Sequence, residues 1–165
     1  MTIIVEDGSI VTGANSWVTR AALITYASAR GVVIADTSAT DVVLVKAADF
    51  ISAMEPRLKG DLVDRNQPTA YPRLNLYISD WWWLSTEIPT AVIKAQFEVA
   101  LEINAGEDPY NPSAAALPVV SERVEGAVTV DYASPGSGLK VTKVLGSSAY
   151  ISILLKTSGL TVIRV

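Results

Sequence analysis

Residues 89–106, PTAVIKAQFEVALEINAG, form the most regular segment of the chain. Pro89 suits the first turn of a helix and Gly106 suits its end, so the segment predicts a helix that runs to about Ala105. Apolar side chains cover more than half of the helix circumference, and the charged ones share one narrow strip: Lys94, Glu98 and Glu102. A helix with so wide an apolar surface must be covered on more than one side.

Gln96 is the one polar residue within that apolar surface. Buried polar groups nearly always have hydrogen-bond partners. We therefore interpret Gln96 as a satisfied amide of the core rather than as part of a ligand site.

Two helices are predicted upstream of this segment. The first lies within residues 14–31, with Thr19 as its N-cap and Gly31 as its stop. The second runs from about Ala39 to Met54, where apolar residues repeat with helical period. The following connection, residues 56–77, is rich in Gly and Pro and is predicted to be a long loop.

The hydrophobic period changes from helical to alternating after residue 118. Residues 128–132 alternate, ASPGSG follows, and residues 139–144 alternate again, which predicts a β-hairpin over 124–144. Two strands are marginally stable alone, so this hairpin needs a partner surface. The last segment predicts a short helix capped by Ser147 or Ser148 and then a strand from Leu160.

These elements predict a mainly helical α+β fold: a bundle of three or more helices with a C-terminal β-hairpin and a short terminal strand or helix–strand unit. At 165 residues the chain is expected to form one domain. We divide it into an extended arm at 1–14, a helical part at 15–118, and the hairpin with the C-terminal tail at 119–165.

The chain contains no Cys and no His, which removes thiolate nucleophiles, imidazole bases and most zinc sites. It also has none of the glycine-rich loops that cradle phosphates. We therefore expect no catalytic residue, no bound cofactor and no metal site. The formal net charge of −4 is unlike the basic balance of a typical nucleic-acid binder. No apolar run is long enough for a membrane span, so no membrane partner is expected.

Three consecutive tryptophans, Trp81, Trp82 and Trp83, pose a geometric problem. Side chains alternate faces in a strand and rotate by about 100° in a helix, so one core cannot take all three. At least one indole should face outward. Asp80 and Glu87 flank the run, and no Lys or Arg lies between Arg73 and Lys94. We therefore favour a contact between protein chains. The alternatives are one core indole with two partly exposed ones, and a stacking surface for nucleic acid.

Several segments resemble a family of tailed-bacteriophage proteins related to head–tail connectors, some members of which are labelled DnaT-like single-stranded-DNA-binding proteins. The matching segments are VEDGSIVTGANSWV, KAADFISAMEPRLKG, QPTAYPR, IPTAVIKAQFEVAL and SERVEGAVTVDYA. The resemblance covers most of the chain, but the three adjacent tryptophans are not part of its pattern.

This resemblance implies a structural virion protein, a head-to-tail adaptor in the neck of the particle, made in the host cytoplasm. It implies a homo-oligomeric ring, commonly a dodecamer, that binds the portal protein on one side and a tail, tail-terminator or nozzle protein on the other. Genomic DNA would pass through the ring without sequence-specific binding. A DnaT-like single-stranded-DNA-binding module stays open as the alternative.

Two groups of residues are candidates for function under these interpretations. The interface candidates are Trp81, Trp82, Trp83, Val128, Val130, Tyr132, Leu139 and Val141. Residues that could line a DNA channel are Arg57, Lys59, Arg65 and Arg73. For the second group we favour a solvated loop, because Asp61 and Asp64 are interspersed with the cations.

Overall fold

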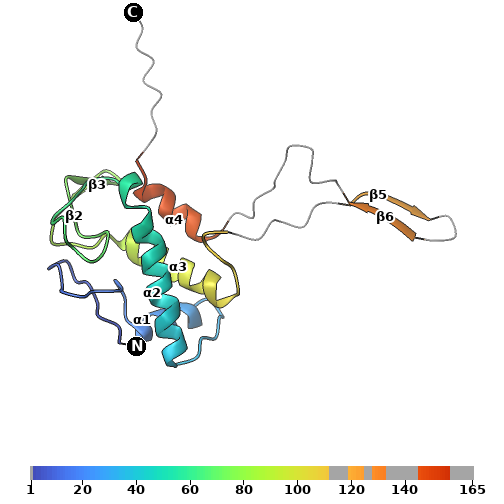
Figure 1. The fold of residues 1–165 in the computed structure, drawn as a ribbon, viewed down its shortest axis with the longest axis horizontal. Helices are drawn as coiled ribbons and strands as arrows, with labels where there is room; N and C mark the ends of the chain where they lie inside the picture. Colours follow the sequence, from blue (N-terminus) through green and yellow to red (C-terminus); the bar gives the residue numbers. More distant parts are fainter. Residues whose placement is uncertain (1, 112–118, 125–127, 133–144, 157–165) are drawn as a thin grey trace, which may run out of the picture.

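The computed structural model describes residues 2–111, 119–124, 128–132 and 145–156 (Figure 1). Its helices are α1 (Arg20–Ser28), α2 (Ser38–Ala53), the short 3₁₀ helix η1 (Glu55–Arg57), α3 (Thr90–Asn104) and α4 (Ser147–Leu154). Its strands form antiparallel pairs: β1 (Asp61–Leu62) with β2 (Arg73–Leu74), β3 (Leu76–Ile78) with β4 (Trp81–Trp83), and β5 (Val119–Val124) with β6 (Val128–Tyr132).

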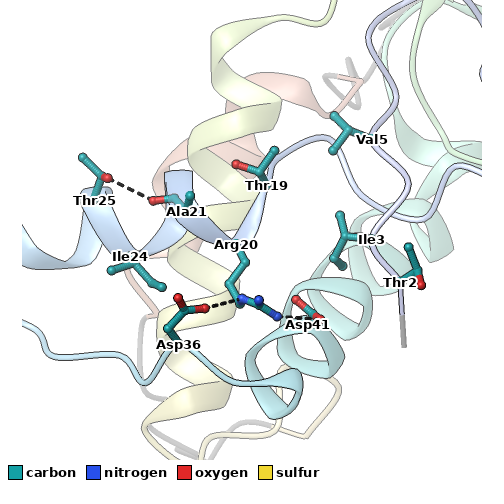
Figure 2. Close-up of a pocket in the computed structure, with 10 residues that line it drawn as sticks. All are labelled: Thr2, Ile3, Val5, Thr19, Arg20, Ala21, Ile24, Thr25, Asp36 and Asp41. Carbon is teal, nitrogen blue, oxygen red and sulfur yellow. Dashed lines mark hydrogen bonds and ion pairs between the residues drawn. The ribbon is translucent and has the colours of Figure 1, made fainter.

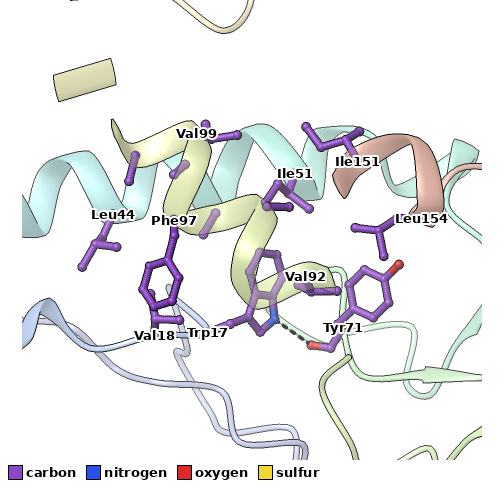
Figure 3. Close-up of a cluster of buried hydrophobic side chains, with 14 of the residues drawn as sticks. Trp17, Val18, Leu44, Ile51, Tyr71, Val92, Phe97, Val99, Ile151 and Leu154 are labelled. Atoms are coloured by element: carbon purple, nitrogen blue, oxygen red, sulfur yellow. Dashed lines mark hydrogen bonds between the residues drawn. The ribbon is translucent and has the colours of Figure 1, made fainter. Parts of the chain in front are cut away.

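Helix α3 is the centre of the hydrophobic core. It packs against both α2 and α4, and α1 contacts the same pair of α2 and α3 (Figure 1). Figure 3 shows apolar side chains of α2, α3 and α4 meeting with Trp17 and Tyr71 from the loops. The wide apolar surface of α3 is therefore covered within one chain, by α2 on one side and α4 on another.

The predicted helices lie within two residues of the observed ones. The Thr19 side chain caps α1 as expected, because its Oγ1 accepts a hydrogen bond from the Ala22 N–H at 3.1 Å. Gly31 has φ of +73°, the left-handed conformation that ends a helix and that glycine adopts without strain. These boundaries confirm the capping signals at Thr19 and Gly31. The cap expected from Ser147 or Ser148 is wrong, because the N-cap of α4 is Gly146, which makes no side-chain cap hydrogen bond.

Gln96 joins three separate segments inside the core. Its Oε1 accepts from the Trp17 backbone N–H at 3.0 Å, and its Nε2 donates to Ser16 Oγ at 2.7 Å and to the Leu44 carbonyl at 3.0 Å. The residue is fully buried. The interpretation of Gln96 as a satisfied core amide is confirmed.

The predicted fold class is wrong in its arrangement of strands. We expected a helix bundle followed by a C-terminal hairpin as its β structure, with residues 56–77 as a loop. The structure places two antiparallel strand pairs, β1–β2 and β3–β4, in the middle of the chain between α2 and α3. Strands of two or three residues are too short to show an alternating period, so the sequence pattern concealed them.

The predicted hairpin over 124–144 also has the wrong partner strand. Strand β6 pairs with β5, which precedes it, with Val124 opposite Val128 and Val119 opposite Tyr132. Closing the shorter connection between β5 and β6 costs less chain entropy than closing the longer one after β6. The expected second strand at 139–144 and the expected strand from Leu160 lie outside the described residues.

Within the described part of the chain, no helix is both long enough and apolar enough to cross a bilayer.

Candidate functional site

Strands β3 and β4 form a tight hairpin whose turn is Ser79–Asp80. Ile78 lies opposite Trp81, so two residues connect the strands. Ser79 and Asp80 have φ of +51° and +67°, the positive pair that a type I′ turn requires. Residues other than glycine adopt positive φ uncommonly. Asn75, just before β3, also has a positive φ, of +53°. The backbone is therefore held in an uncommon conformation at both ends of β3.

The two faces of this hairpin differ in burial. Leu76 and Ile78 point into the core and are almost fully buried. Tyr77, between them, points outward and lies opposite Trp82 of β4. Their ring centroids are 5.1 Å apart. Alternation along a strand thus places one aromatic pair on the solvent face.

Trp81 and Trp83 lie on the opposite face from that pair. Trp83 is partly buried and packs against the core, opposite Leu76. Trp81 extends past the core at the tip and is 73% exposed, nearly the same as the 72% of Trp82. The expectation that at least one indole faces outward is confirmed, and the exposed two occupy opposite faces. We call Tyr77, Trp81 and Trp82 the aromatic hairpin.

The carboxylates beside the aromatic hairpin contact the hairpin itself. Asp80 Oδ1 lies 3.4 Å from the Tyr77 hydroxyl, which donates to it. Glu87 Oε2 accepts from the Leu84 backbone N–H at 3.2 Å. Each carboxylate therefore has a role in the local structure, although both still carry negative charge near the rings.

A buried arginine holds the chain beneath the hairpin. Arg73 Nη1 donates to the Ala70 carbonyl at 3.2 Å and Nη2 donates to the Gly60 carbonyl at 3.0 Å. Its side chain is buried, so Arg73 does not reach the surface at which a channel lining would lie. Tyr71 is fully buried beside it, and this burial raises the pKa of its phenol.

The other candidate residues are distributed over several elements. Arg57 and Arg65 are exposed and Lys59 is half-buried, so these three lie at the surface. Val128, Val130 and Tyr132 lie in β6. Leu139 and Val141 lie outside the described residues.

Apart from the aromatic hairpin, a hollow lies between the N-terminal arm, α1 and α2 (Figure 2). Arg20 is its only cation, and it is bound on two sides: Nε lies 2.6 Å from Asp36 Oδ1 and Nη1 lies 2.8 Å from Asp41 Oδ2. Two carboxylates more than neutralise one guanidinium, so this hollow offers no free positive charge to an anion. The sequence analysis did not identify this arrangement, because Arg20 and its partners lie on different elements.

Tyr77 is the functional candidate that sequence reasoning missed. The available signal was the Ser-Asp pair between LYI and WWW, since polar turn residues between two β-prone triplets indicate a hairpin. Recognising the turn would have placed Tyr77 opposite Trp82. Among the described residues, no group of three or more acidic side chains is arranged to hold a metal ion.

The chain belongs to the family described as "Putative DnaT-like ssDNA binding protein", whose family model matches residues 1–165. No curated protein and no solved structure matches the chain.

This match corrects several expectations. The matched family is not a head-to-tail connector family, and its description names single-stranded DNA rather than a portal or a tail. The adaptor function, the assignment as a structural virion protein, the dodecameric ring, the portal and tail partners, and the passage of genomic DNA without sequence-specific binding are therefore wrong.

Proposed function

We propose that the protein binds single-stranded DNA and that bases stack on the aromatic hairpin. The observation that carries this proposal is the exposure of Trp81 and Trp82, 73% and 72%, on opposite faces of one hairpin. Family membership supports the same chemistry. Indole rings on a soluble protein are normally covered, so an exposed pair indicates a ligand that supplies flat apolar surface.

Stacking selects single strands over duplexes for a geometric reason. Bases in a duplex already stack on their neighbours, whereas bases of a single strand are free to meet an aromatic ring. Every base has such a face, so the binding is tolerant of sequence. Stacking is worth about 1–3 kcal/mol per base, which is enough for two or three rings to fix a strand.

The opposite orientation of the two indoles determines how a strand lies. Tyr77 and Trp82 offer one stacking surface on the outer face, and Trp81 offers another across the turn. A strand that passes over the tip therefore meets rings on both sides of the Ser79–Asp80 turn. Neighbouring bases are separated by the hairpin instead of stacking on each other.

We also propose that the protein acts by binding alone, without catalysis or a cofactor. The support is chemical, since a chain without Cys or His lacks the thiolate nucleophile and the imidazole general base. Its function would then depend on affinity and on the geometry of the bound strand.

The test is a fluorescence titration with oligo-dT. Trp17 is buried, so quenching on binding reports mainly on the exposed indoles. We expect saturable quenching with the unmodified protein, and Trp81→Ala and Trp82→Ala should each weaken binding roughly 5- to 150-fold. Trp81→Ala should keep its thermal stability, because the side chain is not part of the core, and Trp82→Ala should lose no more than about 0.5–1.5 kcal/mol, the contribution of its pairing with Tyr77.

Leu84→Ala is the matched control. Leu84 is an exposed apolar side chain, 65% accessible, just after β4, but it has no ring. Its loss should leave affinity for oligo-dT within about twofold. If the unmodified protein shows no binding at low salt, or if both tryptophan variants bind as well as it does, the proposed function is wrong.

A further inference from the structure

The aromatic hairpin offers rings but no positive charge. No Lys or Arg lies between Arg73 and Lys94, and Asp80 and Glu87 are acidic. Proteins that bind single strands by stacking also need cations that follow the phosphates. Such cations must come from another part of the chain.

Three of the described arginines are already engaged. Arg20 is bound by two carboxylates, and Arg30 lies 3.8 Å from Glu98 and over the ring of Tyr26. Arg73 is buried and donates to backbone carbonyls. These side chains stabilise the fold and are not available for phosphate.

Two distant segments bring three other cations together. Leu58 and Leu155 form an antiparallel bridge. The Lys59 N–H donates to the Leu154 carbonyl and the Lys156 N–H donates to the Arg57 carbonyl, each at 2.8 Å. This register places Arg57 directly opposite Lys156, with Lys59 two residues further along the same segment.

We call Arg57, Lys59 and Lys156 the basic cluster. Among the described residues none of the three forms an ion pair; Lys156 Nζ donates only to the neutral carbonyl of Pro56, at 3.2 Å. Arg57 and Lys156 are exposed, and Lys59 is half-buried. Glu55 and Asp61 flank the first segment, so the three cations exceed the nearby carboxylates by one.

The basic cluster lies at the base of the aromatic hairpin. Gly60 follows Lys59 directly, and its backbone packs so closely on β2 and β3 that an added Cβ would lie 2.6 Å from the Leu74 carbonyl oxygen and 3.4 Å from Leu76 Cδ1. Leu76 is the first residue of β3 and lies opposite Trp83. In Figure 1 the end of α4 and β3 lie at the same end of the helical body.

From this geometry we propose that the basic cluster binds phosphates of the single strand whose bases stack on the aromatic hairpin. The inference rests on the proposed function and adds to it the residues that contact the DNA backbone. Arg57 supplies a planar fork that suits phosphate oxygens, and the two lysines supply compact charges. Three cations correspond to two or three phosphates, a modest electrostatic contribution that agrees with a chain of net charge −4.

Salt dependence tests this assignment. Each phosphate contact to a single strand contributes about 0.7 to the slope of log affinity against log salt. The slope is negative, and the double variant Arg57→Gln/Lys156→Gln should therefore make it shallower by about 1.4 for oligo-dT. Quenching at saturation should be unchanged, because the indoles still meet bases.

The matched control is Arg30→Gln/Lys46→Gln. It also removes one arginine and one lysine charge, but from a position just after α1 and from α2. It should leave the slope within experimental error of the unmodified protein. If both double variants lower the slope equally, the effect is one of net charge and the basic cluster is not the phosphate site. Melting curves should show that both variants fold.

An oligonucleotide made of abasic sites distinguishes binding by the basic cluster from binding by the aromatic hairpin. It carries phosphates and sugars without bases, so Trp81→Ala/Trp82→Ala should not change its weak binding, whereas Arg57→Gln/Lys156→Gln should abolish it. The opposite pattern would overturn the assignment. If the unmodified protein binds oligo-dT but the cluster variant keeps its slope, only this inference fails; if the protein binds no oligo-dT at all, the proposed function fails as well.

Discussion

The Tyr77 ring lies 5.1 Å from the Trp82 ring across the β3–β4 pair, with the two planes inclined at 52°. Such pairs stabilise each other by about 0.5–1.5 kcal/mol beyond their burial. Tyr77 thus limits the rotation of an indole that is otherwise largely free in solvent. The pair forms one stacking surface, in which Tyr77 orients and Trp82 presents the larger face.

This pairing predicts a graded response to substitution. Tyr77→Ala should weaken oligo-dT binding roughly 3- to 10-fold, less than Trp82→Ala, because the indole remains but is less ordered. Tyr77→Phe keeps the ring and loses only the long hydrogen bond to Asp80, so it should bind like the unmodified protein. Titrations of the three variants in parallel measure this order. Equal affinities for Tyr77→Ala and Tyr77→Phe would contradict it.

Gly60 and Gly31 provide a matched pair for stability. Their φ values are +74° and +73°, so replacement by Ala imposes a similar left-handed strain of about 1–2 kcal/mol at both. At Gly31 an added Cβ meets nothing within 4 Å, whereas at Gly60 it lies 2.6 Å from the Leu74 carbonyl oxygen. We expect Gly60→Ala to lower the free energy of unfolding by about 1–3 kcal/mol more than Gly31→Ala.

Urea denaturation of both glycine variants gives this difference directly. Gly60→Ala should also weaken DNA binding, because Gly60 joins the basic cluster to β2 and β3. Equal unfolding free energies for the two variants would show that the backbone at Gly60 moves aside at no cost.

Tyr71 predicts a dependence of stability on alkaline pH. Burial raises the pKa of its phenol above the ordinary value of 10.0, so the unfolded chain loses this proton at lower pH than the folded chain. The folded state is then disfavoured as pH rises above about 10, by up to about 1.4 kcal/mol per pH unit for one group. Burial also raises the pKa of Tyr26, aided by its hydrogen bond to Glu98.

Tyr71→Phe should make that alkaline decline less steep. Among the described residues the Tyr71 hydroxyl has no hydrogen-bond partner, so its removal should cost nothing at pH 7 and should stabilise by up to about 1 kcal/mol. Thermal unfolding at pH 7 and above pH 10 measures both effects. A lower melting temperature for the variant at pH 7 would show that the hydroxyl contributes to the core.

Gln96 predicts the largest loss from a single core substitution. Gln96→Ala leaves the Trp17 N–H, the Ser16 hydroxyl and the Leu44 carbonyl without their buried partner and creates a cavity. We expect a loss of about 3–5 kcal/mol in unfolding free energy. Lys94→Ala, at an exposed position of the same helix, should change it by less than about 0.5 kcal/mol. Chemical denaturation of the two variants provides the comparison.

The helices were predictable because their signals are local. Thr19, Gly31 and Gly106 mark helix ends, and the apolar surface of α3 with a lone Gln96 indicated a covered helix with a bonded amide. These features depend on residues within a few turns of one another, which is the range over which sequence patterns act. The resulting boundaries agree with the structure.

The strand pairs and the basic cluster were not predictable, because they depend on residues that are far apart in the sequence or too few to show a pattern. Strand β1 has two residues and no period. The run after β6, at residues 139–144, alternates in sequence, whereas the actual partner of β6, β5 (VVSERV), does not. The negative charges around Trp81 and Trp82 suggested that phosphates would be repelled. That local count missed Lys156, which pairs with Arg57 only through the tertiary fold.

The bridge between Leu58 and Leu155 means that the basic cluster is assembled from two segments that are far apart in the sequence. Lys156 and its acceptor Pro56 are separated by 100 positions in sequence, so a ribosome-bound chain that has emerged only through α3 has the aromatic hairpin but lacks one of the three cations. Contacts of such long range form only after a large chain-entropy cost has been met. Under the proposed function, a chain that has emerged only through α3 would make fewer phosphate contacts than one that includes Lys156, and would bind a strand less tightly.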